Sequence, residues 1–361
     1  MTDTTAVFRR RSTSILSAAL ASTFFLAACG SASSGEGESG TDGSPVTLRL
    51  ADSFPPTHRI TVEGGEVFME RATELSGGSI QFEHFPAEQL AGAADLLDAA
   101  ADGVSDISYV GVAYHGDSLP LSDVGSLPGS FQRSELGSQA YWHVMEDSLM
   151  EKEFLPKGVR PVWAALYPPY NLTTTKVRVE TLDDLKGLQI RAAGGTLSRM
   201  VQELGGTPVE LAAPEIYQAL QRGTIDGSAG PISSLGDYNL EEVLKYGTTN
   251  LSLGGFVITY VINEDVFQGL SQEQQDALTQ AGEEAMMHLT SVFDEDEVTA
   301  AEELEAEGMD FYELADDEAE RWNTAAKSVW DDWAAELDSQ GLPGSETVDM
   351  WEDALEQVGA E

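Results

Sequence analysis

The run from Leu185 to Gly195 constrains the fold of this chain more than any other segment. It reads Leu-Lys-Gly-Leu-Gln-Ile-Arg-Ala-Ala-Gly-Gly, which predicts the end of a short helix, a glycine stop, a β-strand, and a glycine pair that opens the next helix. Arg191 lies on that strand, close to its junction with the helix. A guanidinium there presents a planar fork of donors beside a helix N-terminus, and both features favour a carboxylate.

Positive charge is scarce in the rest of the chain. Its 361 residues include 19 Lys and Arg against 62 Asp and Glu, a formal net charge of −43 at pH 7. An arginine placed on an ordered strand therefore needs a reason, and so acidic a protein will not bind nucleic acid through its phosphates. The acidity indicates either a saline environment, which screens surface carboxylates from one another, or the ordinary solubility of an acidic secreted protein.

Residues 1–28 have the features of an export signal. Arg9–Arg11 form a cationic start, and Ile15–Ala28 is an apolar stretch that is too short to span a bilayer. Leu26–Cys29 resembles a lipobox, in which the cysteine becomes the lipid-bearing N-terminus of the mature protein. The alternative is an ordinary signal peptide followed by an incidental thiol.

Residues 29–45 predict a flexible tether, because they are rich in Gly, Ser and acid and contain no large apolar residue. Cys29 is the only cysteine, so the exported chain forms no internal disulfide. The signal carries three arginines and one aspartate, so its removal takes the net charge from −43 to about −45. No later stretch approaches ~20 apolar residues.

Strands and helices alternate through the first part of the folded region. The apolar patterns predict strands over 46–51, 80–85 and 106–110, with helices over 63–75 and 93–101 between them. Such alternation predicts a βαβ sheet with helices on both faces.

Two segments are predicted to cross between two lobes. The prolines of Tyr167–Tyr170 interrupt regular structure before the β-favouring run 171–175, and Gly254–Asn263 is a long apolar strand. Ser271–Gln274 has the form of a capping box and begins a helical run of some 36 residues that ends before Gly308. At ~1.5 Å per residue that helix is about 54 Å long, a length that suits a brace along both lobes.

The chain lacks the motifs of the common catalytic and metal centres. Its five histidines form neither an H-E-x-x-H motif nor a Cys/His zinc pattern, and the sequence has no G-x-S-x-G, P-loop or G-x-G-x-x-G motif. We therefore expect no metal, no cofactor and no enzymatic activity. The C-terminal tryptophans lie among acids, a pattern that favours packing anchors on amphipathic surface helices: Trp322, Trp330, Trp333 and Trp351.

Together these features resemble a known family. The run Thr181–Arg191, with the lipobox, the crossing strands and the long helix, is similar to the solute-binding proteins of tripartite ATP-independent periplasmic (TRAP) transporters, the DctP or C4-dicarboxylate-binding type, in their lipoprotein form. The likeness continues through Leu204–Val209 and Pro214–Gly227 and includes Phe85–Leu90. It covers nearly all of the chain from Val46 onward.

The resemblance implies an α/β, two-lobed, periplasmic-binding-protein-like (type II) fold. It places residues 46–167 and about 256–298 in lobe I, and residues 168–255 and about 299–361 in lobe II. It also implies capture of a small organic acid between the lobes and delivery to the small and large membrane subunits. Lipid on Cys29 would hold the receptor at the outer face of the cytoplasmic membrane. A lipoprotein that senses a ligand for a signalling receptor, and an exported enzyme acting on a small organic acid, are the alternatives.

The resemblance also identifies ligand contacts. In the family, the arginine that corresponds to Arg191 forms a bidentate pair with the ligand carboxylate. This chain has Asn171 where some members have a second cation, Ser228-Ala229-Gly230 where many have Gln-Glu-Asn, and Gly111 where some have an acid. These differences imply a roomier cavity with one anion clamp and more apolar lining, which favours a monocarboxylate over a C4-dicarboxylate.

The candidate ligand-binding residues are therefore the clamp and a set of polar and aromatic side chains around it: Arg191, Asn171, Tyr170, Tyr109, Ser228, Gly230, Phe256 and His58, with Tyr114 and Tyr167 as further aromatic candidates.

Overall fold

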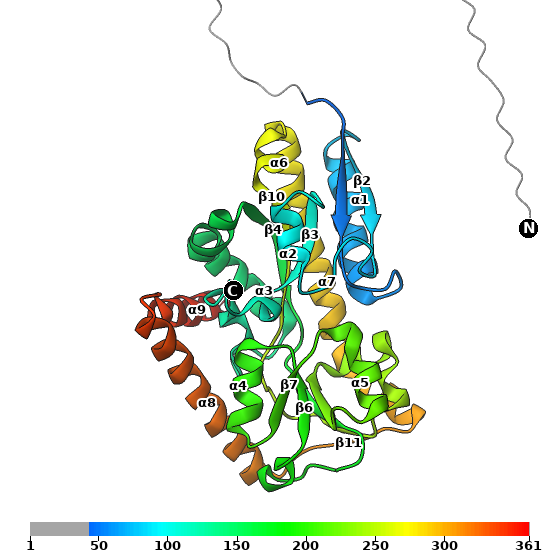
Figure 1. The fold of residues 1–361 in the computed structure, drawn as a ribbon, viewed down its shortest axis with the longest axis vertical. Coiled ribbons are helices and arrows are strands. Elements are labelled where there is room, and N and C mark those ends of the chain that lie inside the picture. Colours follow the sequence, from blue (N-terminus) through cyan, green and yellow to red (C-terminus); the bar gives the residue numbers. More distant parts are fainter. Residues whose placement is uncertain (1–42, 361) are drawn as a thin grey trace, which may run out of the picture. The chain divides into compact units, whose positions relative to one another are not determined.

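The computed structural model describes residues 43–360, whose strands form two sheets (Figure 1). The predicted signal peptide, Cys29 and all but the end of the predicted tether lie outside these residues. The first sheet has the order β2-β1-β3-β10-β4, with β1 parallel to β2 and β3, and β10 antiparallel to β3 and β4. Its strands are β1 (Val46–Ala51), β2 (Ile80–Phe85), β3 (Ile107–Gly111), β4 (Val159–Leu166) and β10 (Val257–Asn263).

The second sheet has the order β11-β9-β5-β8-β6-β7. In it β6 is parallel to its neighbours β7 and β8, whereas β5 is antiparallel to β8 and β9. Its strands are β5 (Asn171–Thr174), β6 (Gln189–Ala192), β7 (Thr207–Glu210), β8 (Gly227–Gly230), β9 (Tyr246–Thr248) and β11 (Asp310–Tyr312). We call the first sheet and the elements packed on it lobe I, and the second sheet and the elements packed on it lobe II.

Helices pack on both sheets. They are α1 (Val67–Leu75), α2 (Leu96–Ala101), α3 (Ser134–Val144), α4 (Gly195–Glu203), α5 (Ile216–Arg222), α6 (Glu264–Gly269), α7 (Gln272–Glu307), α8 (Asp316–Ser339) and α9 (Gly344–Gly359). Shorter helical segments used below are η1 (Ile60–Glu66), η2 (Val112–His115), η3 (Ser122–Ser126), η4 (Met145–Phe154), η8 (Ile232–Ser234) and η9 (Gly236–Tyr238). Within residues 43–360, no helix combines the length and apolar character needed to cross a membrane.

The predicted βαβ alternation is confirmed in lobe I. The strands over 46–51 and 80–85 have the predicted bounds, and β3 begins one residue later than predicted. The first helical segment begins three residues earlier, as the π-helical η1, and continues as α1. A Cβ at Gly64 would lie 3.1 Å from both Trp163 and Leu289, so the bare backbone lets η1 pack closely on them.

Both predicted crossings are present. β4 ends in the first sheet at Leu166, and after the Tyr167–Tyr170 segment β5 joins the second sheet. The chain returns between β9 and β10, where Tyr167 N donates to Phe256 O at 3.1 Å and Tyr170 N donates to Gly254 O at 2.9 Å. These hydrogen bonds hold the two crossing segments against each other.

The long helix α7 spans 36 residues, as the sequence predicts. Its capping box is formed by Ser271 Oγ, which accepts from Gln274 N at 3.3 Å, and by Gln274 Oε1, which accepts from Ser271 N at 3.1 Å. Gly308 ends it with a φ of 110°. The helix contacts β4, α1 and α3 of lobe I as well as η8 and β11 of lobe II, so it braces both lobes.

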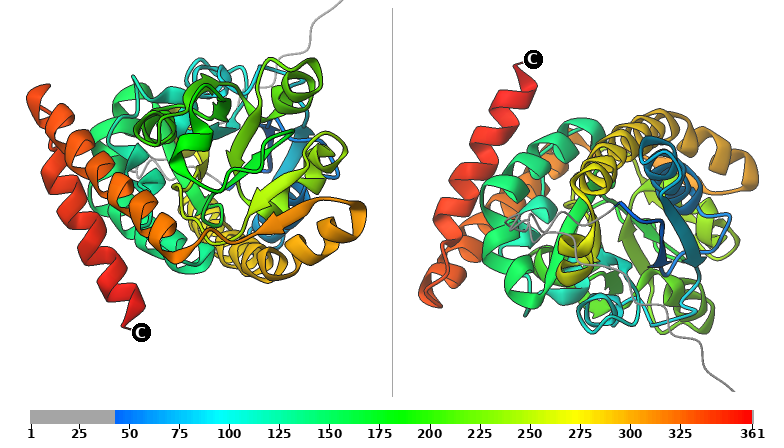
Figure 2. Two further views of the ribbon diagram at one scale, coloured as in Figure 1. Left: turned by 90° about the horizontal axis from the view of Figure 1, so that it is seen from below. Right: turned by 90° about the horizontal axis from the view of Figure 1, so that it is seen from above.

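The C-terminal helix α9 returns to lobe I, whereas α8 packs on α4 of lobe II as well as on α9. Trp351 is fully buried, with its ring 6.5 Å from that of Phe131 and 6.4 Å from that of Tyr141, and Trp333 belongs to the same apolar cluster. α8 and α9 lie together on the side of the molecule away from α1 (Figure 2). Residues 299–361, assigned to lobe II from the sequence, therefore divide, because β11 joins the second sheet whereas α9 packs on α3. The tryptophans that were predicted as packing anchors are buried, apart from the partly exposed Trp330.

Gly282 tests the packing of α7 on lobe I. A Cβ at this position would overlap Val162 O and lie 3.0 Å from Trp163 Cβ. We expect Gly282→Ala to destabilise the protein by about 1–3 kcal/mol, because the helix must move away from β4. Urea unfolding measures this. Gly269→Ala is the control, since a Cβ there meets no atom within 4 Å; equal stability of the two variants would contradict the packing described.

Candidate ligand-binding site between the lobes

Arg191 lies in β6 with a buried side chain, 4% exposed. The strand runs between β7 and β8, where Arg191 pairs in register with Val209 and Ser228. Its Nε donates to Leu211 O at 3.0 Å, which fixes the direction of the guanidinium. No carboxylate of residues 43–360 forms an ion pair with Arg191. The guanidinium is thus buried with its charge unmatched by the described part of the chain, a costly state that an anionic ligand relieves.

A small cavity of about 40 Å³ lies against this arginine, between the lobes. Lobe I contributes Phe54, Tyr109, Tyr114, Tyr167 and Phe256 to its lining. Lobe II and the crossing contribute Tyr170, Arg191, Ala213, Ile216, Ser228, Ala229, Gly230, Pro231, Ser234, Leu235, Tyr238 and Leu240. The cavity is therefore aromatic and apolar, with one guanidinium and a set of hydroxyl groups.

Tyr170 lies beside the guanidinium. Burial raises the pKa of Tyr170, and the positive charge of Arg191 opposes that rise. The phenol thus stays protonated at neutral pH and can donate a hydrogen bond next to the arginine. Tyr114 spans the two lobes, since its hydroxyl accepts from Ala213 N at 3.1 Å. One wall of the cavity is therefore complete only when the lobes are together.

The expectation of a roomy cavity is wrong for this structure. Gly111 leaves space at the end of β3, but aromatic side chains fill it: a Cβ at Gly111 would lie 2.5 Å from Tyr109 Oη, 2.6 Å from Phe256 Cζ and 2.9 Å from Tyr114 Cδ2. A carboxylate side chain has no room at this position. The small residues in the sequence therefore accommodate aromatic rings, and a bound ligand needs these rings or the lobes to move.

Asn171 is not among the residues that line the cavity. Its Oδ1 accepts from Leu251 N at 3.1 Å and from Thr248 Oγ1 at 3.3 Å, so it joins β5 to the segment that follows β9. The side chain is buried and occupied by this structural role. Asn171, which stands where some family members have a second cation, therefore makes a contact between strand segments and does not reach the cavity.

His58 also lies outside the lining, one layer behind it. Its ring centroid is 4.7 Å from that of Phe54 and 4.9 Å from that of Tyr238, and both of these rings line the cavity. Nδ1 accepts from Ile60 N at 3.1 Å. Burial, helped by the charge of Arg59, lowers the pKa of His58 to about 3, so the imidazole is neutral. It supports the aromatic wall and offers no positive charge to a ligand.

The sequence analysis missed several lining residues. Phe54 could have been found, because it follows β1 directly and the carboxyl ends of strands commonly carry binding residues. Tyr238 had no such signal, since it lies in the short helical segment η9. Ile216, Leu235 and Leu240 line the cavity and also belong to the core of lobe II, so their apolar spacing in the sequence predicts core packing and gives no sign of the cavity.

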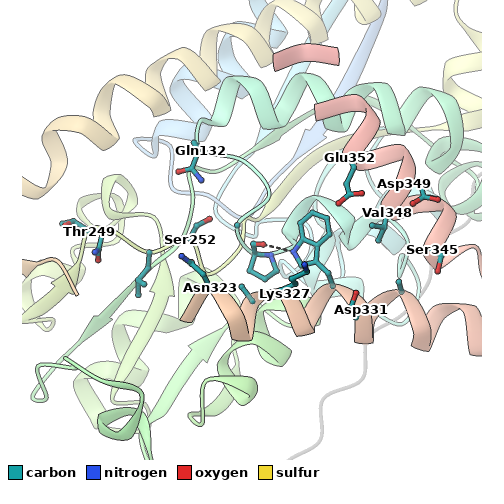
Figure 3. Close-up of a pocket in the computed structure, with 17 residues that line it drawn as sticks. Gln132, Thr249, Ser252, Asn323, Lys327, Asp331, Ser345, Val348, Asp349 and Glu352 are labelled. Atoms are coloured by element: carbon teal, nitrogen blue, oxygen red, sulfur yellow. Dashed lines mark hydrogen bonds between the residues drawn. The ribbon is translucent and has the colours of Figure 1, made fainter. Parts of the chain in front are cut away.

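A larger concavity lies elsewhere, between α8, α9 and the loops at 128–132 and 249–252 (Figure 3). Its volume is about 890 Å³, and the labelled side chains Lys327, Asp331 and Glu352 give it mixed charge. Trp330 closes part of it by donating from Nε1 to Pro128 O at 2.8 Å. This groove has a mainly polar lining, whereas the cavity at Arg191 has a mainly apolar lining and carries a buried unmatched charge. The smaller cavity is therefore the candidate ligand site.

Across residues 43–360, no group of three or more His, Cys, Asp or Glu side chains is arranged to hold a metal ion. The chemistry the cavity offers is recognition, through a planar cation, hydroxyl groups and aromatic faces.

Comparison with known proteins agrees with this geometry. Residues 51–337 match the DctP family, described as bacterial extracellular solute-binding protein, family 7. A solute-binding protein of Albidiferax ferrireducens is 24% identical over 80% of this chain and 87% of its own length. The chain belongs to this family.

Two solved structures refine the class. A TRAP solute-binding protein from Rhodoferax ferrireducens, in complex with copurified benzoate, is 25% identical with a TM-score of 0.81, over 87% of this chain and 99% of that one. A TRAP periplasmic solute-binding protein from Bordetella bronchiseptica, with bound (R)- and (S)-mandelate, is 26% identical with a TM-score of 0.80, over 87% of this chain and 100% of that one. The protein is thus an extracytoplasmic solute receptor of a TRAP transporter and not an enzyme, and the resemblance and fold class expected from the sequence are confirmed.

Two glycines of the cavity provide a matched test of its packing. We expect Gly111→Ala to lower the free energy of unfolding by roughly 1–3 kcal/mol, because the added methyl group meets three aromatic side chains. Gly230→Ala should be tolerated, since a Cβ there meets no atom within 4 Å. The shift of the urea midpoint measures both, and a Gly230→Ala variant as unstable as Gly111→Ala would contradict the described packing.

Proposed function

We propose that this receptor binds a compact aromatic or otherwise apolar monocarboxylate, with Arg191 pairing with the carboxylate. The buried guanidinium without a carboxylate partner is the observation that carries the proposal. A planar guanidinium forms two parallel hydrogen bonds with a carboxylate, and closure of the lobes strengthens the pair by excluding water.

The rest of the cavity supports this ligand class. Arg191 is the one cationic side chain among the described residues that line it, so a dicarboxylate would bury its second charge without a partner. The rings of Phe54, Tyr109 and Phe256 offer flat apolar surface to the body of the ligand. Ser228, directly opposite Arg191 in the neighbouring strand, adds a hydroxyl group. Relatives that hold benzoate and mandelate are consistent with such a ligand.

Binding proceeds by opening and closing. A cavity of about 40 Å³ is far smaller than the ~300–1,000 Å³ typical of ligand sites, so the ligand enters when the lobes are apart. The carboxylate docks on Arg191 in lobe II, and the aromatic wall of lobe I then covers the ligand. The closed form is what the small and large membrane subunits receive, and no covalent bond changes.

We also propose that lipid on Cys29 anchors the receptor to the outer face of the cytoplasmic membrane. The small residues before the only cysteine, Leu26-Ala27-Ala28, support this processing. Residues 29–45 would then act as the tether between the lipid and the folded lobes.

The first test is removal of the guanidinium. We expect Arg191→Ala to weaken the binding of benzoate by about 30-fold or more, because truncating a buried charged partner typically costs ~2–5 kcal/mol. Arg191→Lys should fail as well, since a point charge does not reproduce the planar fork. Titration calorimetry measures the dissociation constants.

Arg222→Ala is the matched control, because Arg222 is exposed on α5 of the same lobe. Its affinity for benzoate should equal that of the unaltered protein. Near-normal affinity of Arg191→Ala would contradict the proposed role, and tighter binding of succinate than of benzoate would contradict the ligand class.

The second test is the salt dependence of association. A protein with a net charge near −45 repels an anion at long range, so added salt should accelerate benzoate association through screening. Stopped-flow measurements at increasing sodium chloride concentration give the rate constant. A rate that falls steadily as salt rises would show that a local positive field, and not the overall charge, governs the approach.

A further inference from the structure

The glycine pair after β6 receives two groups from lobe I. Gly194 has a φ of 124° and Gly195 a φ of 52°, and α4 starts at the second of them. A Cβ on Gly194 would overlap Ala113 O, and a Cβ on Gly195 would overlap the carboxylate of Asp123. Both contacts cross between the lobes, because the two partners lie in the η2 and η3 region of lobe I. The two glycines therefore allow lobe I to approach the backbone closely, and they also allow the turn into α4.

Asp123 caps α4 from the opposite lobe. Its Oδ2 accepts a hydrogen bond from Thr196 N at 2.7 Å, and the side chain is buried, 2% exposed. The first N–H groups of a helix have no partner within the helix, and a carboxylate satisfies both their hydrogen-bonding capacity and the helix dipole. α4 thus obtains its capping group only when the lobes are together.

A second buried carboxylate holds Asp123 in place. Glu153 of η4 accepts from Leu121 N at 2.7 Å and from Ser122 N at 2.8 Å, which fixes the backbone where η3 begins. Asp123 is the next residue, so its carboxylate is presented from a segment that lobe I itself makes rigid. The contact is therefore a built feature of lobe I and not the chance meeting of two surface loops.

The energy of this contact depends on closure. Burial raises the pKa of Asp123 to about 6, and the N–H of Thr196 opposes that rise. The carboxyl group is therefore mostly ionised at pH 7.5, and its hydrogen bond is charge-assisted, a stronger class than neutral pairs. When the lobes separate, water replaces the bond on both sides and α4 loses its cap.

We propose that Asp123 and the Gly194–Gly195 pair form a closure latch, which positions the β6–α4 junction, and with it Arg191, against lobe I. The inference rests on the proposed function, because closure over a ligand at Arg191 is what the latch stabilises. Only Ala192 and Ala193 separate Arg191 from the glycine pair, so the latch and the ligand contact move together. The latch also operates in the ligand-free protein, in which it favours the closed form.

Lobe separation without ligand tests the latch directly. The protein used for this test begins at residue 30, so that Cys29 is not labelled. Spin labels on Val104→Cys in lobe I and Val177→Cys in lobe II, both at exposed positions, report the distance between the lobes. We expect Asp123→Ala to move ligand-free molecules from the short distance to the long one. Asp123→Asn, which keeps an acceptor for Thr196 N, should restore most of the short distance. Identical distance distributions in the unaltered protein and in Asp123→Ala would overturn the latch.

Benzoate kinetics provide the second readout. Asp123→Ala should release benzoate about 10-fold faster, because the latch forms after the ligand has docked. It should not slow association, because the ligand enters the open form, which this variant favours. Asp117→Ala is the control, since this exposed acid lines a groove that Asp123, Gly194 and Gly195 also line. Melting temperatures measured in parallel show whether each variant is folded. A dissociation rate equal to that of the control would overturn the latch.

The two readouts separate this inference from the proposed ligand. If the unaltered protein does not bind benzoate but Asp123→Ala still changes the distance between lobes, the latch stands and the ligand class is wrong. If benzoate binds tightly and neither the distance nor the release rate responds to Asp123→Ala, the ligand class stands and the latch is wrong.

Discussion

The buried guanidinium of Arg191 is the interaction on which the rest of the site depends. Water solvates an exposed arginine well, so a strand that buries one needs an anion in return. The described chain offers Arg191 only a carbonyl and neighbouring phenols, although acids outnumber basic residues by more than three to one. No carboxylate of the described residues forms an ion pair with this charge, which supports the proposal that a ligand carboxylate binds there.

Patterns that belong to a single element could be predicted from the sequence. The capping box at Ser271 and the glycine at Gly308 mark the ends of α7 because each works within one turn of the helix. The prolines after Tyr167 mark the crossing for the same reason. The destination of α9 was beyond such reasoning, since it depends on the pocket for Trp351 that Phe131 and Tyr141 form far away in the sequence.

The site divides in the same way. The place of Arg191 beside the cavity was predictable because its strand and the following glycine pair form a local signal, and Tyr170 and Phe256 lie at the crossing segments. Tyr109 lies in the middle of β3 and also lines the cavity. Asn171 and His58 could not be distinguished from cavity-lining residues by their sequence, because their partners Leu251 and Tyr238 come from other segments. The size of the cavity could not be inferred either, since small residues admit either a ligand or neighbouring rings.

The continuous helix α7 has a mechanical consequence. A helix of 36 residues that packs on both sheets behaves as a stiff spine, and the paired crossing segments beside Tyr167 and Gly254 form a second line of attachment. The helix α8 adds a third attachment, because it packs on α4 of lobe II and on α9, which packs on α3 of lobe I. Any movement of one lobe relative to the other must therefore bend or shift these shared elements, so the energy of opening depends on helix packing outside the cavity.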